Sequence, residues 1–117
     1  MNIILCTDLL FSTKITGTAK ALAQTYLVVR TLEKLEQALA QVPAEARLIV
    51  DLNTTSVDPV AAVAQARAQV PSLRIVAFVS HVQAELAAAA RAAGADRVLA
   101  RSAFVNELPT LLSGSGV

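Results

Sequence analysis

Residues 48–53 read LIVDLN, and this stretch decides the fold. Three apolar residues run into an aspartate, which is the pattern of a strand buried on both faces that ends in a polar group. Four more short apolar runs, at residues 3–6, 26–29, 75–79 and 98–100, have the same character. Longer alanine- and leucine-rich stretches with helical periodicity separate them. This alternation predicts five β-α units and a parallel sheet with helices on both faces.

The stretches between the strands contain recognisable helix boundaries. Thr31 is a candidate N-cap, and Glu33 lies in the first turn, where the helix dipole favours a carboxylate. Asp58 followed by Pro59 predicts an N-cap and a first helical residue. Gly94 marks the end of a further helix over residues 82–93.

The first and the last helix have less definite limits. We expect the first over residues 12–24. The last contains Pro109, whose missing N–H costs little only in the first turn of a helix. We therefore expect this helix to start near Val105 or Asn106.

The composition limits the class of protein. The chain has 117 residues, 55% hydrophobic and 16% charged, which predicts one globular domain over residues 1–117. Ten basic against nine acidic residues give a net charge of +1 without a basic run, so nucleic acid is not an expected partner. One cysteine and one histidine exclude an intramolecular disulfide framework and a Cys/His zinc site. The sequence has no pattern of a secretion signal or membrane span, so we expect a cytoplasmic protein without a membrane partner.

Polar side chains gather where the strands are expected to end. The residues that follow the first, third, fourth and fifth strands are Thr7 and Asp8, Asp51 and Asn53, Ser80 and His81, and Arg101 and Ser102. The second strand is followed only by Arg30. Ligands of open, doubly wound sheets bind outside the carboxyl ends of the strands. Two carboxylates, a hydroxyl and a guanidinium are thus expected at one edge.

With LIVDLN at the third strand, AFVS at the fourth and GADRVLARSAF around the fifth, the sequence resembles the receiver domains of two-component response regulators. The resemblance covers essentially the whole chain. It implies a flavodoxin-like (CheY-like) α/β fold, a three-layer α/β/α sandwich with a doubly wound five-stranded parallel sheet in the order 2-1-3-4-5. It also implies a stand-alone signalling domain of a phosphorelay that is not an enzyme.

The resemblance assigns a role to each residue of the edge. It implies Asp51 as phosphoacceptor, Asp8, Asp51 and the backbone carbonyl of Asn53 as ligands of Mg²⁺, Ser80 and Arg101 as phosphoryl contacts, and His81 as a gating residue. An aspartate that attacks a phosphoryl donor brings two anions together, so a divalent cation and a basic side chain are needed to neutralise the charge.

Four positions depart from the family's pattern. Thr7 replaces one of two adjacent acids, Arg101 replaces a lysine, His81 replaces a small residue, and Val98 replaces an aromatic residue. The lost acid weakens the Mg²⁺ site, which needs carboxylate oxygens. A planar guanidinium also does not reproduce a compact ammonium group. These departures indicate a degenerate receiver whose Mg²⁺ binding is weak or lost.

Each candidate also has a structural interpretation. Asp51 could cap a loop, Asp8 could be the N-cap of an early first helix, Ser80 could cap the helix that follows it, Arg101 could form an ion pair that replaces the metal, and Cys6 could be a small buried hydrophobe. A different class, a flavodoxin-type small-ligand protein, is suggested by a hydroxyl-rich segment formed by Thr13, Thr16, Gly17 and Thr18. Asp8 would repel a phosphate there, and aromatic residues make up only 3% of the chain.

Two functions are compatible with these residues. The favoured one is acceptance of a phosphoryl group on Asp51 from a histidine kinase, with output through contacts to another signalling protein. The alternative is a phosphorylation-independent pseudo-receiver that serves as an interaction or dimerisation module. The resemblance implies a contact face formed by the fourth helix, fifth strand and fifth helix, through which a pseudo-receiver would form a homodimer or bind a partner. This face includes residues 87–93, Arg97, Val105 and Leu112. An open metal site at Asp51 favours the first function, and a pair with Arg101 favours the second.

Overall fold

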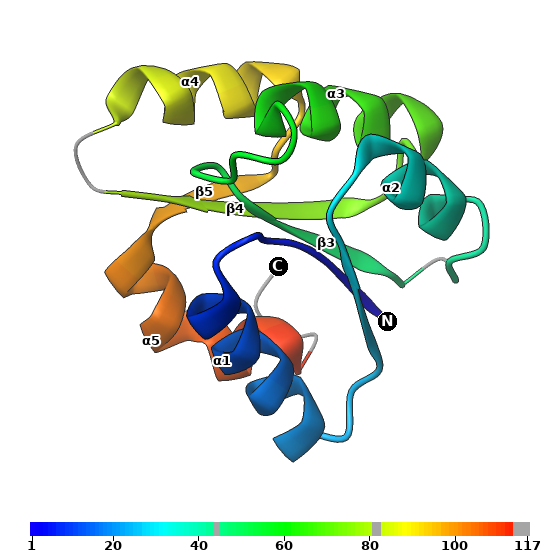
Figure 1. The fold of residues 1–117 in the computed structure, drawn as a ribbon, viewed down its shortest axis with the longest axis vertical. Helices are drawn as coiled ribbons and strands as arrows, with labels where there is room; N and C mark the ends of the chain where they lie inside the picture. Colours follow the sequence, from blue (N-terminus) through cyan, green and yellow to red (C-terminus); the bar gives the residue numbers. More distant parts are fainter. Residues whose placement is uncertain (44, 81–82, 114–117) are drawn as a thin grey trace.

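Five parallel strands form the sheet of the protein (Figure 1). The computed structural model describes residues 1–43, 45–80 and 83–113. The strands are β1 (Asn2–Leu5), β2 (Tyr26–Val29), β3 (Arg47–Asp51), β4 (Arg74–Val79) and β5 (Arg97–Ala100). Their order is β2-β1-β3-β4-β5, and each neighbouring pair is parallel. The predicted flavodoxin-like topology is confirmed, and every strand boundary lies within one residue of its predicted position.

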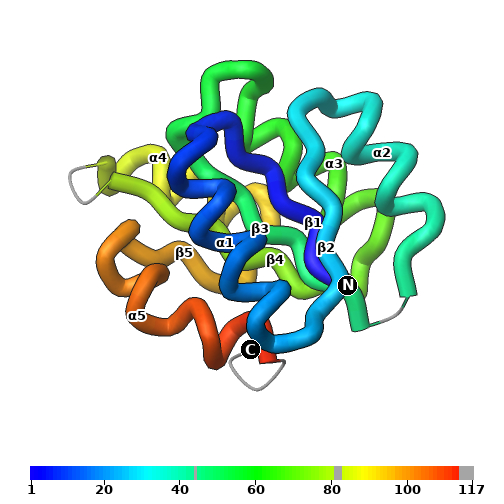
Figure 2. Tube along the Cα trace, turned by 60° about the horizontal axis from the view of Figure 1, so that its bottom comes forward, coloured from blue at the N-terminus to red at the C-terminus, as the bar shows by residue number. Residues whose placement is uncertain are grey.

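Helices cover both faces of the sheet, as Figures 1 and 2 show. One layer consists of α1 (Leu9–Ala21) and α5 (Arg101–Leu112). The other consists of α2 (Leu32–Leu39), α3 (Pro59–Gln69) and α4 (Ala84–Ala93). The three-layer α/β/α sandwich is therefore confirmed. No helix in the described part of the chain is long and apolar enough to cross a membrane.

Two apolar layers hold the sandwich together. Ile3, Leu48 and Ile75 pack on the side of α2, α3 and α4, while Ile4, Ile49 and Val76 pack on the side of α1 and α5. Consecutive residues of a strand face opposite sides of the sheet, so an uninterrupted apolar run supplies both layers. This is why the central strands contain no alternation of polar and apolar residues.

The predicted caps of α2, α3 and α4 are confirmed. The Thr31 hydroxyl accepts a hydrogen bond from the Lys34 N–H at 3.0 Å. The Asp58 carboxylate accepts from the first turn of α3, and Pro59 is the first residue of that helix. Gly94 ends α4 with a φ of +123°, a backbone conformation that residues with a Cβ atom rarely adopt.

The predicted starts of the first and last helices are wrong. α1 begins at Leu9, three residues before Ser12, because the Asp8 carboxylate accepts a hydrogen bond from the Phe11 N–H at 3.1 Å and caps the helix. α5 begins at Arg101, directly after β5, and Pro109 lies inside it. Four buried residues of α5, namely Phe104, Leu108, Leu111 and Leu112, pack against the sheet and α1. Their burial outweighs the one backbone hydrogen bond that Pro109 cannot donate.

One arginine, Arg67, connects three segments near the amino ends of the strands. The guanidinium of Arg67 in α3 donates to the backbone carbonyls of Pro71, Leu73 and Gly94 at 2.7 to 3.1 Å. It also forms an ion pair with Asp96 at 3.0 Å. These contacts join the end of α3, the start of β4 and the α4–β5 connection.

Candidate functional site at the carboxyl edge of the sheet

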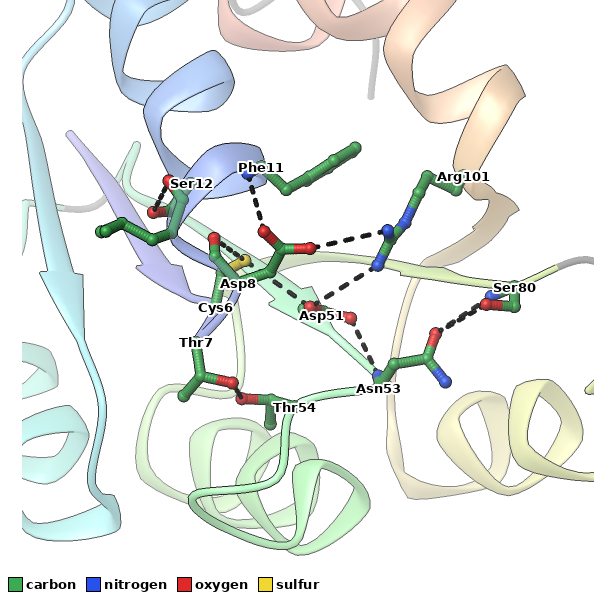
Figure 3. Close-up of polar contacts among 11 residues, drawn as sticks. Cys6, Thr7, Asp8, Phe11, Ser12, Asp51, Asn53, Thr54, Ser80 and Arg101 are labelled. Atoms are coloured by element: carbon green, nitrogen blue, oxygen red, sulfur yellow. Dashed lines mark hydrogen bonds and ion pairs between the residues drawn. The ribbon is translucent and has the colours of Figure 1, made fainter.

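The parallel register makes the strands end together, so the residues that follow them share one edge. Figure 3 shows Asp8, Asp51 and Arg101 pointing toward one another, with Asn53 and Ser80 beside them. The structure therefore brings together five of the six site residues predicted from the sequence. The sixth, His81, lies outside the described residues.

Asp51 is the last residue of β3, and its side chain is only 3% exposed. Its Oδ1 accepts a hydrogen bond from the Asn53 N–H at 2.8 Å. Its Oδ2 lies 3.6 Å from the Cys6 thiol and 3.9 Å from Nη2 of Arg101. Asp51 thus caps its own loop, as the structural interpretation predicted, and also directs one oxygen toward a cation.

Arg101 is the first residue of α5 and lies between the two carboxylates. Its Nη1 is 3.8 Å from Oδ2 of Asp8 and its Nη2 is 3.9 Å from Oδ2 of Asp51. These distances describe ion pairs and are too long for hydrogen bonds. The guanidinium carbon lies 4.6 Å from the ring centre of Phe11 and 5.8 Å from that of Phe78. The aromatic faces therefore hold the cation beside the acids.

Asp8 has two separate functions in this geometry. Its Oδ1 caps α1 through the Phe11 N–H, while its Oδ2 faces Arg101. The side chain is 42% exposed, so water screens its interaction with the guanidinium more than it screens that of Asp51. The capping interpretation of Asp8 is confirmed.

Asn53 connects the β3–α3 loop to the end of β4. Its Oδ1 accepts hydrogen bonds from the backbone N–H and the hydroxyl of Ser80, at 3.1 and 3.2 Å. Its Nδ2 donates to Oε1 of Gln83 at 2.5 Å. The Ser80 hydroxyl therefore contacts Asn53. The prediction that Ser80 caps the following helix is wrong, because the N-cap residue of α4 is Gln83.

Two further polar residues near the site were not predicted. Gln83 contacts Asn53, and the hydroxyl of Thr54 lies 2.7 Å from that of Thr7. Thr7, at the position where the resemblance implies a second acid, has its hydroxyl paired with that of the buried Thr54. No local pattern in the sequence marks Gln83 or Thr54. Each of them contacts a residue from a distant segment of the chain: Gln83 contacts Asn53, and Thr54 contacts Thr7.

Cys6 is fully buried beneath the site. Burial, and secondarily the Asp51 carboxylate, raises the pKa of its thiol from 9.0 to about 12. The sulfur lies 3.6 Å from both Oδ2 of Asp51 and the Asp8 carbonyl oxygen, which are alternative acceptors for its one proton. Cys6 is thus a neutral, buried side chain at physiological pH, as its apolar surroundings indicated.

The hydroxyl-rich segment after β1 is not a phosphate loop. Thr13, Thr16, Gly17 and Thr18 lie within α1, and the three threonine hydroxyls donate to backbone carbonyls of the preceding turn. Their hydroxyls are therefore used within the helix. The phosphate-loop interpretation of this segment is contradicted, because the segment lies inside α1, which begins at Leu9.

The residues at this edge do not fit a Mg²⁺ ion. Asp8 and Asp51 each use one carboxylate oxygen for a backbone N–H, and both remaining oxygens face the guanidinium of Arg101. A dication between those oxygens would lie against a permanent positive charge. In the described ranges, no three residues of the His, Cys, Asp or Glu type come together in a group that could hold a metal ion. A hard divalent cation needs carboxylate oxygens free of competing cations.

Comparison with known proteins identifies the fold. The sequence matches no family model and no curated protein. The receiver domain of NtrX from Brucella abortus is 15% identical with a TM-score of 0.81, over 98% of this chain and 97% of that one. A CheY-like receiver domain protein from Methanospirillum hungatei JF-1 is 11% identical with a TM-score of 0.78, over 97% of this chain and 94% of that one.

A third similar structure contains a modified site. It is a response regulator protein from Burkholderia pseudomallei with a phosphorylated aspartic acid, a calcium ion and citrate. It is 20% identical with a TM-score of 0.78, and the match covers 95% of this chain. The chain spans 65% of that protein's length and 25% of a longer NtrX chain. Together, the topology and these similarities show that the chain has the CheY-like fold of response regulator receiver domains.

Proposed function

We propose that this chain is a receiver-like signalling domain that acts through protein contacts, is not an enzyme and works independently of phosphorylation. The observation that supports the proposal is the position of Arg101, within 3.9 Å of carboxylate oxygens of both Asp8 and Asp51. An arginine stays protonated at every physiological pH, so the site contains a permanent counter-cation. This cation stands in the place where an active receiver, by resemblance, would need a divalent metal.

The surroundings of Asp51 also disfavour phosphorylation. Its side chain is almost fully buried, and both carboxylate oxygens already have partners. Phosphorylation would replace the single negative charge of the Asp51 carboxylate by a phosphate with roughly two negative charges. Arg101 offers a single positive charge, and it already faces two carboxylates. The charge of a phosphorylated site would thus remain largely uncompensated.

Phosphoryl acceptance by Asp51 remains a second candidate function. It is favoured by the position of Asp51 at the end of β3, with Oδ2 beside a cation that could contact phosphoryl oxygens. With a small donor such as acetyl phosphate, Oδ2 would attack phosphorus, the bond from phosphorus to the acetate oxygen would break, and acetate would leave. The Burkholderia pseudomallei protein with its phosphorylated aspartic acid has the same fold.

Treatment with acetyl phosphate and Mg²⁺, followed by intact-mass spectrometry, separates the two functions. We expect no added phosphoryl group on the wild-type protein. The control is the double variant Thr7→Asp with Arg101→Lys, which restores the acid and the lysine that the resemblance calls for. Labelling of the wild type that disappears in Asp51→Asn would establish the second function and refute the first.

Titration with MgCl2 followed by NMR tests the metal directly. We expect the amide resonances of Asp8, Asp51 and Asn53 to stay in place up to tens of millimolar, because Arg101 faces the free carboxylate oxygens. Saturable shifts of these three resonances at lower concentrations would show that a divalent cation displaces the guanidinium.

The contact surface that we propose for output is formed by α4, β5 and α5. Ala88 and Ala92 are exposed on α4, which permits close approach of a second copy or another protein. Ala87, Ala90 and Leu112 are buried, so the expectation that they line this face is wrong. In sedimentation experiments we expect self-association that Asp51→Asn leaves unchanged and Ala88→Glu weakens, because an unpaired charge in an interface is strongly unfavourable. A monomer at all concentrations would exclude the homodimer.

A further inference from the structure

A groove runs along the free edge of the sheet, between β2 and α2. Figure 1 shows β2 at one margin of the sheet, leading into α2. The groove has a volume of about 490 Å³ and is formed by residues 27–31 together with Lys34, Gln37, Ala38 and Gln41. It lies away from Asp51 and Arg101, so its occupancy does not depend on the function proposed for that site.

The backbone of β2 has hydrogen-bonding groups available on this side. In the described part of the chain, β2 pairs with β1 alone. The Asn2 N–H donates to the Thr25 carbonyl at 3.0 Å, and the register places Asn2 opposite Tyr26. Backbone groups of a paired strand alternate between its two sides. Those of Tyr26 and Val28 are therefore directed away from β1, toward the position that another strand would take.

The side chains of the groove select a particular kind of strand. Leu27 is 42% exposed, which is unusual for a large apolar residue within a strand, and it lines the groove together with Ala38 of α2. Arg30 and Lys34 provide two positive charges where β2 passes into α2. None of the described residues that line the groove is acidic. The adjacent Glu33 is already engaged by the Gln37 amide, at 3.4 Å.

We propose that this groove binds an extended segment of another protein, which adds to the sheet beside β2. Its backbone would pair with the free groups of Tyr26 and Val28. An apolar side chain would contact Leu27, and carboxylates would contact Arg30 and Lys34. The recognised sequence is thus an apolar β-forming stretch followed by acidic residues.

Charge complementarity argues against a second copy of this chain as the occupant. In antiparallel pairing of two β2 strands, Arg30 of each copy would lie near the uncharged Gln24 and Thr25 of the other. In parallel pairing, it would lie near another arginine, and like charges directly opposite each other are destabilising. Neither arrangement supplies the carboxylates that the two cations require.

The test uses the ¹⁵N-labelled full chain and a synthetic probe. The probe is a capped hexapeptide of alternating valine and threonine that ends in two glutamates, and the control peptide ends in two lysines. We expect the acidic peptide to shift the amide resonances of residues 26–31 and to slow hydrogen exchange at Tyr26 and Val28. The lysine peptide should bind at least about tenfold more weakly than the acidic peptide, and added salt should weaken the complex with the acidic peptide.

Charge reversal in the protein provides the matched control. The double variant Arg30→Glu with Lys34→Glu should lose the acidic peptide and gain the lysine peptide, whereas Lys14→Glu on the exposed face of α1 should behave like the wild type. Arg30, Lys34 and Lys14 are all exposed, and the NMR spectrum of each variant shows whether the fold is kept. Equal binding of the two peptides by the wild type, shifts confined to other elements, or no shifts at millimolar peptide would overturn the proposal. Concentration-dependent protection of Tyr26 and Val28 without peptide would also overturn it, because a second copy would then occupy the groove.

Discussion

Replacing Arg101 by methionine removes the cation beside Asp8 and Asp51 while keeping a long apolar side chain over Phe11. At 3.9 Å, one pair of unit charges interacts by about 4 kcal/mol at an effective dielectric constant near 20. The net effect is smaller, because Arg101 is 37% exposed and Asp8 is 42% exposed. Removing one partner of a fully buried pair costs about 3 to 5 kcal/mol. Since only Asp51 is buried, we expect Arg101→Met to lower the free energy of unfolding by about 2 kcal/mol.

Urea denaturation of a double-mutant cycle isolates this interaction. Asp51→Asn keeps an oxygen that can accept from the Asn53 N–H and removes the charge that Arg101 neutralises. The double variant should therefore be less destabilised than the sum of the single variants, with a coupling energy of about 1 to 2 kcal/mol. Arg30→Met, which removes an exposed cation that belongs to neither of these ion pairs, should change stability by less than about 0.5 kcal/mol. Strictly additive effects of Arg101→Met and Asp51→Asn would show that the guanidinium does not compensate the buried carboxylate.

Three further predictions concern the scaffold. Gly94→Ala should lower the free energy of unfolding by about 1 to 3 kcal/mol, measured by urea titration, because φ is +123° and the new Cβ would lie 2.8 Å from Cγ of Arg67. Since burial raises the pKa of the Cys6 thiol from 9.0 to about 12, its contribution to stability is complete below pH 9 and is lost as the pH rises toward 12. The urea midpoint should therefore fall more steeply for the wild type than for Cys6→Ala as the pH rises from about 9 toward 12. Thr31→Ala should lower stability by about 1 kcal/mol, seen in thermal unfolding, because the Lys34 N–H loses its acceptor, whereas Thr31→Ser should retain the cap.

The sequence predicted the sheet well because the signals for it are local and strong. Each strand contains an apolar run of three to five residues, and both faces of the central strands are buried, so no other register keeps the core dry. The caps at Thr31, Asp58 and Gly94 were also predictable, because each depends on one residue type at one position. The start of the first helix was missed although its cap at Asp8 is local, because Asp8 was also a candidate metal ligand. The start of the last helix was missed because it depends on tertiary contacts.

The error at the start of α5 explains why the role of Arg101 could not be settled from the sequence. A helix that began near Val105 would leave Arg101 in an extended loop with no fixed direction for its side chain. The actual helix begins at Arg101 itself, since burial of Phe104 and Leu108 outweighs the unfavourable proline further along. That start fixes the backbone of Arg101 at the end of β5 and directs its guanidinium over Phe11 toward the two acids. The choice between an open acidic site and an internally neutralised one is therefore made by the packing of α5 against the sheet, where Phe104 stacks on Phe78, one of the two rings that contact the guanidinium.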